Sequence, residues 1–68
     1  MEKIKIDYQF IVRYSNDKTE YYIERFYREL TDEELQEAMD RIMTDLSKQY
    51  EYKNIFVKSM MLDRINII

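Results

Sequence analysis

One helix is the feature of this 68-residue chain that most restricts its fold. Thr31 and Glu34 have the spacing of a capping box, in which the Thr hydroxyl and the Glu carboxylate each accept a hydrogen bond from the other residue's amide. Leu30 before the cap and Leu35 after it are placed to form a hydrophobic staple. Apolar residues then recur along one stripe at helical spacing: Leu35, Ala38, Met39, Ile42, Met43, Leu46 and Tyr50. The segment 30–50 is therefore predicted to be an amphipathic helix with one buried face.

The segment before this helix has the pattern of two strands joined by a turn. Apolar and polar side chains alternate from residue 3 to residue 14, as in a strand with one buried face, and Ile11 is the only apolar residue on the polar side. Residues 15–18 are predicted to form the turn, because Asn and Asp side chains can close it in a chain without Gly. Residues 19–29 are predicted to be the returning strand. Apolar residues on both of its faces predict either a bulge near Glu24-Arg25 or a partial cover over both faces.

Residues 54–68 form the last element, and their β-branched residues favour a strand. Apolar side chains would occupy both faces of it, with Ile55, Val57, Met61, Ile65 and Ile67 at odd positions and Phe56, Met60, Leu62 and Ile68 at even positions. This pattern favours a central strand, or an edge strand that packs against a partner subunit. A bulge or turn within residues 59–63 is the alternative.

The order of elements predicts the fold class. The helix has no Gly cap, so its end is expected between Lys48 and Lys53, with Asn54 as a candidate left-handed residue. The order is β-β-α-β within a single domain over residues 1–68. We therefore expect an α+β protein, with an antiparallel three-stranded sheet and one helix packed on a face.

The residue types that are missing argue against several kinds of site. The chain has no Cys and no His, so it lacks the thiolate and the imidazole that serve as nucleophile, general base or metal ligand. Without Gly it has no glycine-rich phosphate loop, and a metal would depend on carboxylates alone. We therefore expect no catalytic activity, no cofactor and no metal site. The sequence also contains no long apolar run, so a cytoplasmic protein without membrane contact is expected.

The acidic helix is the first candidate binding surface. The net charge is −3, but the segment from Asp32 to Lys48 has six acids and two bases, a net of −4. The candidate partner-binding acids are Glu33, Glu34, Glu37 and Asp40. These carboxylates would imitate the phosphates of a nucleic acid and enter the basic groove of another protein. The alternative is a solvated face that keeps the chain soluble, supported by an ion pair between Glu37 and Arg41.

The aromatic residues are the second candidate. The chain contains seven Tyr and three Phe, and Tyr is enriched at interface hot spots. The candidate partner-binding aromatics are Tyr21, Tyr22, Phe26 and Phe56, as the seam of a homodimer or a pocket for a target side chain. The alternative is ordinary strand propensity. The second sheet face would carry Ile11, Tyr22, Phe26, Phe56 and Met60, an apolar set that needs a cover.

Direct nucleic-acid binding is a third possibility, because bases and aromatics are interleaved in Arg25-Phe26-Tyr27-Arg28. The sequence pI of 4.9 argues against it, so no direct contact with nucleic acid is expected.

Taken together, these features resemble the small phage-encoded inhibitors of uracil-DNA glycosylase. The resemblance rests on the alternating first strand, Asn16-Asp17-Lys18, Tyr21-Tyr22, Leu30-Thr31-Asp32, Ile55-Phe56-Val57-Lys58 and Met61-Leu62-Asp63-Arg64-Ile65. This chain departs from that family in its lack of a turn Gly, its longer helix and its longer tail. The stretch Leu30-Thr31-Asp32-Glu33-Glu34-Leu35, with Ala38-Met39, is also similar to a small uncharacterised domain of Gram-positive bacteria.

The resemblance implies a class rather than a target. It implies a small acidic binding protein that forms a dimer, competes with DNA and blocks a host protein for nucleic-acid processing or defence, in the host cytoplasm. We therefore expect a non-enzymatic protein-binding module and DNA mimic whose partner has a basic groove. The alternatives are a structural or accessory homo-oligomer and a weak single-stranded nucleic-acid binder.

Overall fold

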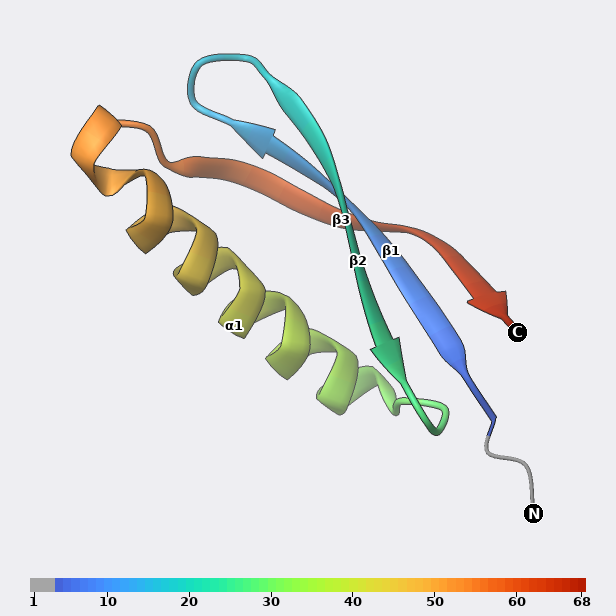
Figure 1. The fold of residues 1–68 in the computed structure, drawn as a ribbon. Coiled ribbons are helices and arrows are strands. Elements are labelled where there is room, and N and C mark those ends of the chain that lie inside the picture. Colours follow the sequence, from blue (N-terminus) through green and yellow to red (C-terminus); the bar gives the residue numbers. More distant parts are fainter. Residues whose placement is uncertain (1–3) are drawn as a thin grey trace.

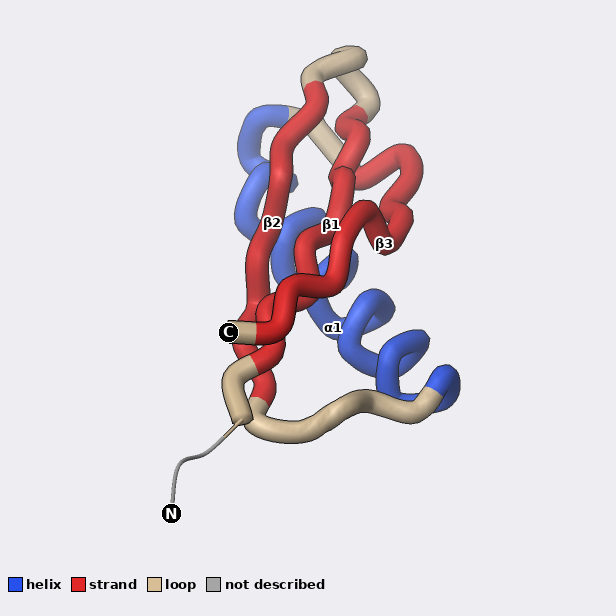
Figure 2. The backbone as a smooth tube through the Cα atoms, turned by 90° about the vertical axis from the view of Figure 1, so that its right-hand side faces the viewer, coloured by secondary structure: helices blue, strands red, loops and turns tan. Residues whose placement is uncertain are grey.

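Three antiparallel strands and one long helix make up the fold in the computed structural model, which describes residues 4–68 (Figure 1). The elements in chain order are β1 (Ile6–Tyr14), β2 (Thr19–Phe26), α1 (Asp32–Tyr50), the 3-10 turn η1 (Glu51–Lys53) and β3 (Val57–Ile67). The strand order in the sheet is β2-β1-β3, and α1 lies on one side of it (Figure 2). This confirms the predicted α+β class and the order β-β-α-β. Strand β1 begins at Ile6 rather than at residue 3, which lies outside the described residues.

Side-chain hydrogen bonds define the start of α1, whereas backbone bonds and a left-handed residue define the turn after its end. The Thr31 hydroxyl accepts from the Glu34 amide at 3.2 Å, and the Glu34 carboxylate accepts from the Thr31 amide at 3.1 Å. After Tyr50 the chain continues through η1 to Asn54, whose φ of 59° lies in the left-handed region. Asn tolerates this region better than most residues other than Gly, which is how a chain without Gly can turn here. The predicted capping box and the predicted role of Asn54 are both confirmed.

The β1–β2 hairpin is regular from one end to the other. Its turn places Asp17 at a φ of 66°, and the Asn16 side chain accepts from the Lys18 amide at 3.2 Å. Within this pairing the register continues without a shift from Ile6 opposite Phe26 to Arg13 opposite Thr19. The predicted bulge near Glu24-Arg25 is therefore wrong. Side chains alternate along β2, so the even-numbered ones lie on the side of α1 and the odd-numbered ones on the other side.

Strand β3 is an edge strand, so its predicted central position is wrong. The central strand is β1, and all five of its helix-side residues are buried: Ile6, Tyr8, Phe10, Val12 and Tyr14. The two-sided pattern of β3 has another cause, because its register against β1 shifts at Lys58 and again at Asp63. Each extra residue reverses the alternation, so Met60 and Leu62 on one side of Asp63 share a face with Ile65 and Ile67 on the other. The predicted bulge within residues 59–63 is confirmed.

The core lies between β1 and α1. Phe10 and Val12 are completely buried, and Ala38, Ile42 and Leu46 of α1 are buried against the same side of the sheet. The hydroxyl of buried Tyr8 accepts a hydrogen bond from the Leu30 amide at 2.9 Å, which fixes the loop that leads into the helix. Leu30 and Leu35 are half-buried and pack against this core.

Replacement of Ile42 by Ala is expected to remove most of the side chain that is buried deepest among the residues of α1. A buried Ile-to-Ala change costs roughly 2–5 kcal/mol of the free energy of unfolding, a large share of what a small domain has. Urea unfolding followed by circular dichroism measures this loss. The matched control is Ile23→Ala on an exposed position of β2, which is expected to cost about 0.5 kcal/mol. Equal losses in the two variants would contradict the described core.

Candidate protein-binding surfaces

The side of α1 that points away from the sheet carries an acidic ridge. Glu33, Glu37 and Asp40 lie at helical spacing opposite the buried stripe of Ala38, Ile42 and Leu46. All three acids are exposed, and we call these three residues the outer helix face. Asp40 accepts one hydrogen bond from the Gln36 amide group at 3.1 Å, whereas Glu33 and Glu37 pair with none of the described residues. The structure therefore leaves this face negatively charged.

The bases nearest to this face are bound elsewhere. Arg41 donates from one nitrogen to both carboxylate oxygens of Glu24 on β2, at 2.7 and 2.9 Å. The predicted pair between Glu37 and Arg41 is therefore wrong, because Glu24 lies within reach of the flank of α1 that carries Arg41. Arg28, in the loop before α1, donates two hydrogen bonds to Glu34. Arg28 thus neutralises Glu34 on the flank of α1, and Arg41 neutralises Glu24 on β2, so neither arginine pairs with the outer helix face.

Glu34 has a structural role, although the sequence suggested it as a partner-binding acid. Its carboxylate holds the Thr31 amide and the Arg28 guanidinium, and the side chain is half-buried. The hydrogen bond from Arg28, followed by the one from the Thr31 amide, lowers the pKa of Glu34 to about 2. A carboxylate with these bonds is not free to bind a second protein.

The side of the sheet away from α1 has an apolar centre. Cross-strand pairing places Ile11 of β1 between Tyr21 of β2 and Met61 of β3. Tyr21 and Met61 are 61% and 64% exposed, and Ile23 beside them is exposed as well. We call Ile11, Tyr21, Ile23 and Met61 the open sheet face. Its extent makes it a second candidate contact surface.

Polar pairs surround the open sheet face. Arg25 donates two hydrogen bonds to Asp7, at 2.7 and 3.1 Å, and this hydrogen bonding is the main reason for the lowered pKa of Asp7. The Gln9 amide group donates to Asp63 at 2.8 Å. Sequence reasoning missed Ile23 and Met61. Ile23 could have been found, because it and Tyr21 are both odd-numbered and so share a face of β2. The position of Met61 could not be found in this way, because the bulges of β3 interrupt the alternation of its faces.

The four predicted aromatics do not form one surface, so the predicted seam is wrong as a unit. Tyr21 belongs to the open sheet face. Tyr22 and Phe26 lie on the helix side, half-buried against the core, and the Phe26 ring meets Tyr8 edge-on at 5.5 Å. Phe56 is exposed just before β3 and lines an open pocket with Met43 of α1. The predicted apolar second face thus retains Ile11, while Tyr22, Phe26 and Met60 belong to the helix side.

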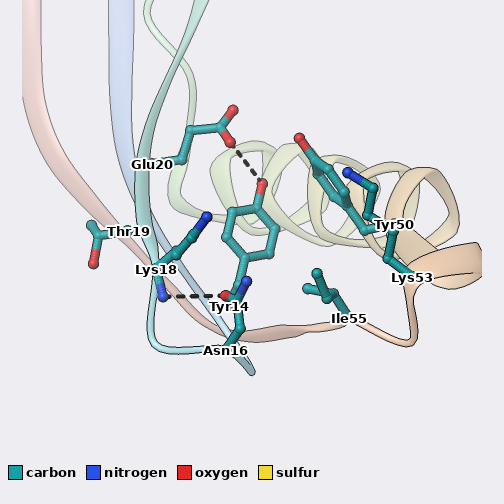
Figure 3. Close-up of a pocket in the computed structure, with 8 residues that line it drawn as sticks. All are labelled: Tyr14, Asn16, Lys18, Thr19, Glu20, Tyr50, Lys53 and Ile55. Carbon is teal, nitrogen blue, oxygen red and sulfur yellow. Dashed lines mark hydrogen bonds between the residues drawn. The ribbon is translucent and has the colours of Figure 1, made fainter.

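A pocket of about 270 Å³ lies at the hairpin end of the molecule (Figure 3). Tyr14 of β1 stands between Glu20 of β2 and Tyr50 of α1, with its hydroxyl 3.3 Å from the Glu20 carboxylate (Figure 3). Burial, followed by the negative charge of Glu20, raises the pKa of Tyr14 to about 12. Such a phenol keeps its proton at neutral pH, so it can donate a hydrogen bond but is a poor source of a phenolate nucleophile.

Among residues 4–68, no helix combines the length and apolar character that crossing a membrane requires. The same part of the chain holds no group of three acidic, His or Cys side chains arranged to bind a metal ion. Comparison with protein-family models, with curated proteins and with solved structures finds no match to this chain.

Neutralisation of Glu34 is expected to change how acid unfolds the protein. Its pKa of about 2 in the folded chain lies below the ordinary value of 4.5, so its contribution to stability is full above pH 4.5 and is lost as the pH falls towards 2. In Glu34→Gln, the loss of stability that protonation of Glu34 causes between pH 4.5 and pH 2 should disappear. Stability at pH 7 should also fall, because the pair with Arg28 is lost. Urea midpoints between pH 2 and pH 6 measure both effects. The matched control is Glu37→Gln, an acid without an ion pair, and equal pH slopes in the two variants would contradict the assignment.

Proposed function

We propose that this chain is a non-enzymatic protein-binding module whose outer helix face docks in the basic, nucleic-acid-binding groove of another protein. One observation carries the proposal. Arg28 and Arg41 pair with Glu34 and Glu24 on the side of α1 next to β2, so Glu33 and Glu37 pair with none of the residues that the structure describes. A face of one sign supports long-range attraction to a groove of the opposite sign.

The spacing of these acids supports nucleic-acid mimicry. Four helical residues rise about 6 Å, so the backbones at Glu33 and Glu37 are separated by about that distance along the axis, and Asp40 follows after about 4.5 Å more. One strand of duplex DNA carries a phosphate about every 3.4 Å along its axis. The acidic ridge therefore repeats on the scale of one to two phosphate steps, which suits a groove built from Lys and Arg.

The pKa shifts support a binding role over a catalytic one. The lowered pKa values of Asp7 and Glu34 each arise from an ion pair with an arginine that ties two elements together. Tyr14, the buried phenol, holds its proton more firmly than usual. Each shift thus favours the ordinary charge state at neutral pH, whereas a general base or nucleophile needs a pKa moved towards neutrality.

The class of partner follows from the acidic face together with the resemblance in sequence. We propose a phage-type inhibitor that acts in the host cytoplasm on a nucleic-acid-processing or defence protein. Direct binding of nucleic acid is less favoured, because Arg25 and Arg28 are already paired with Asp7 and Glu34.

The open sheet face supports a second candidate function. Tyr21, Ile11 and Met61 form an apolar row across all three strands, and Tyr is enriched at the hot spots of interfaces. On this alternative the chain is a structural or accessory module, and the helix acids serve only for solubility.

Reversal of two outer-face charges tests the first function. Glu33→Lys with Glu37→Lys is expected to weaken partner binding by about tenfold or more, because like charges would then meet in the groove. The measurement is affinity capture from host lysate at low salt, followed by displacement of the bound proteins with duplex DNA. The proposed function is supported by proteins that bind to the wild type, are displaced by DNA and do not bind to the charge-reversed variant.

The matched control is Glu29→Lys with Glu51→Lys, which changes the net charge by the same amount at exposed positions off the outer helix face. It should retain the same proteins as the wild type. Proteins that both doubly reversed variants keep, or that DNA does not displace, would contradict mimicry by this face. Loss of binding in Tyr21→Lys alone would favour the open sheet face instead.

A further inference from the structure

The outer edge of β3 is the feature that the proposed function does not explain. Strand β3 runs for 11 residues and pairs with β1 along one edge only within the described chain. Ile65 and Ile67 lie on the helix side of the sheet, yet they are 51% and 71% exposed. Figures 1 and 2 show why, since the C-terminal end of β3 projects away from α1. The strand therefore exposes both an edge and an apolar strip.

Two hydrogen bonds show which residues of β3 direct their backbone amide and carbonyl towards β1 and which direct them towards the free edge. The Ser15 amide donates to the Phe56 carbonyl at 2.9 Å, and the Ile68 amide donates to the Lys5 carbonyl at 2.8 Å. In an antiparallel ladder, residues alternate between pairs that bond each other and pairs whose amides and carbonyls point away. Continued through the register of β3 with β1, this alternation directs the backbone of Val57 to the free edge, together with four residues further along: Met60, Leu62, Ile65 and Ile67.

We propose that this edge pairs with the same edge of a second copy of the chain, antiparallel, about a two-fold axis between Asp63 and Arg64. Leu62 then lies opposite Ile65 of the second copy, and Met60 lies opposite its Ile67. Each pair joins residues whose backbones point outward and whose side chains lie on the same side of the sheet. The two three-stranded sheets become one continuous sheet of six strands, with both helices on one face.

The bulge at Asp63 explains why the occupant is a second copy. Because of the bulge, the last four outward residues, from Met60 to Ile67, are spaced by two, three and two positions rather than by two throughout. In a strand without a bulge, every second residue directs its backbone to the same edge. Such a strand could form hydrogen bonds with the outward residues on one side of Asp63 but not with those on both sides. A second copy in antiparallel orientation presents the same spacing in reverse, so its bulge meets this one at the axis and both halves match.

Charge complementarity supports the same register. At the axis, Asp63 of each chain faces Arg64 of the other, which gives two ion pairs by symmetry. Arg64 has no side-chain bond to the described residues, and Asp63 accepts one hydrogen bond from Gln9 through one carboxylate oxygen. Exposed ion pairs add little affinity, but a wrong register would lose them and so they favour this one.

The surface area is large enough for such an interface. The chain exposes 5427 Å², whereas a folded monomer of 8.6 kDa exposes about 4,700 Å². The excess of about 700 Å² is spread over the whole surface, of which the β3 edge and the open sheet face are parts, and a standard interface takes roughly 800 Å² from each partner.

Cysteine pairs in this Cys-free chain test the register. Met61 and Asn66 lie on the open side of the sheet and are exposed, and the proposed axis places Met61 opposite Asn66 of the second copy. Their Cα atoms would be about 4.5 Å apart, within the range for a disulfide. Met61→Cys with Asn66→Cys should therefore give a covalent dimer under mild oxidation on a non-reducing gel.

The matched controls are the two single variants. Their cysteines would lie five residues apart along the paired strands, about 17 Å, so neither should form the dimer. Equal crosslinking of the single and double variants would overturn the register. Sedimentation equilibrium supplies the second measurement, with twice the chain mass expected for the wild type and the chain mass for Ile65→Lys with Ile67→Lys.

Circular dichroism checks that the latter variant is folded. A wild type that stays monomeric at several hundred micromolar would overturn the proposal, and so would a dimer that Tyr21→Lys disrupts and Ile65→Lys with Ile67→Lys does not. These experiments use the purified chain alone, so their outcome is independent of whether the outer helix face binds a groove.

Discussion

The packing of β1 against α1 is the interaction on which the rest of the structure depends. A chain of this size hides only about 60% of its unfolded surface, so one well-buried row must supply much of the stability. β1 supplies it, because it has neighbours on both edges and α1 over the side that carries Tyr8, Phe10 and Val12. Tyr8 joins the core to the start of the helix, because its ring is buried in the core and its hydroxyl accepts a hydrogen bond from the loop before α1.

The way α1 is attached to the sheet also sets its charge pattern. Arg41 and Arg28 reach Glu24 and Glu34 on the flank next to β2, and each pair joins two segments. Such exposed pairs add little stability, but they take the nearest bases away from the outer helix face. The negative face is therefore a consequence of how the helix docks and not only of how many acids it contains.

Local features could be predicted from the sequence, and features that depend on distant segments could not. The capping box at Thr31 and the left-handed Asn54 each follow from a few neighbouring residues, whereas the bulge at Asp63 is one of the alternatives that the pattern of β3 leaves open. Strand order does not, because the two-sided pattern of β3 suits a central strand as well as a bulged edge strand. For Arg41, sequence spacing offers Glu37, whereas the fold brings Glu24 within 2.7 Å.

The ratio of one helix to three strands accounts for the uncovered part of β3. A helix is about 10 Å wide, whereas three strands at a spacing of about 4.8 Å form a sheet about 14 Å wide, so one helix cannot cover all three strands along their whole length. The bulge at Asp63 then directs Ile65 and Ile67 to the side that α1 would have to cover, at the end where β3 projects away from it. Pairing of two β3 edges places these side chains beside Leu62 and Met60 of the second copy. The same bulge thus places apolar side chains from both halves of β3 on the helix side. It also makes the spacing of the outward residues from Met60 to Ile67 the same in both directions, so an antiparallel second copy matches it.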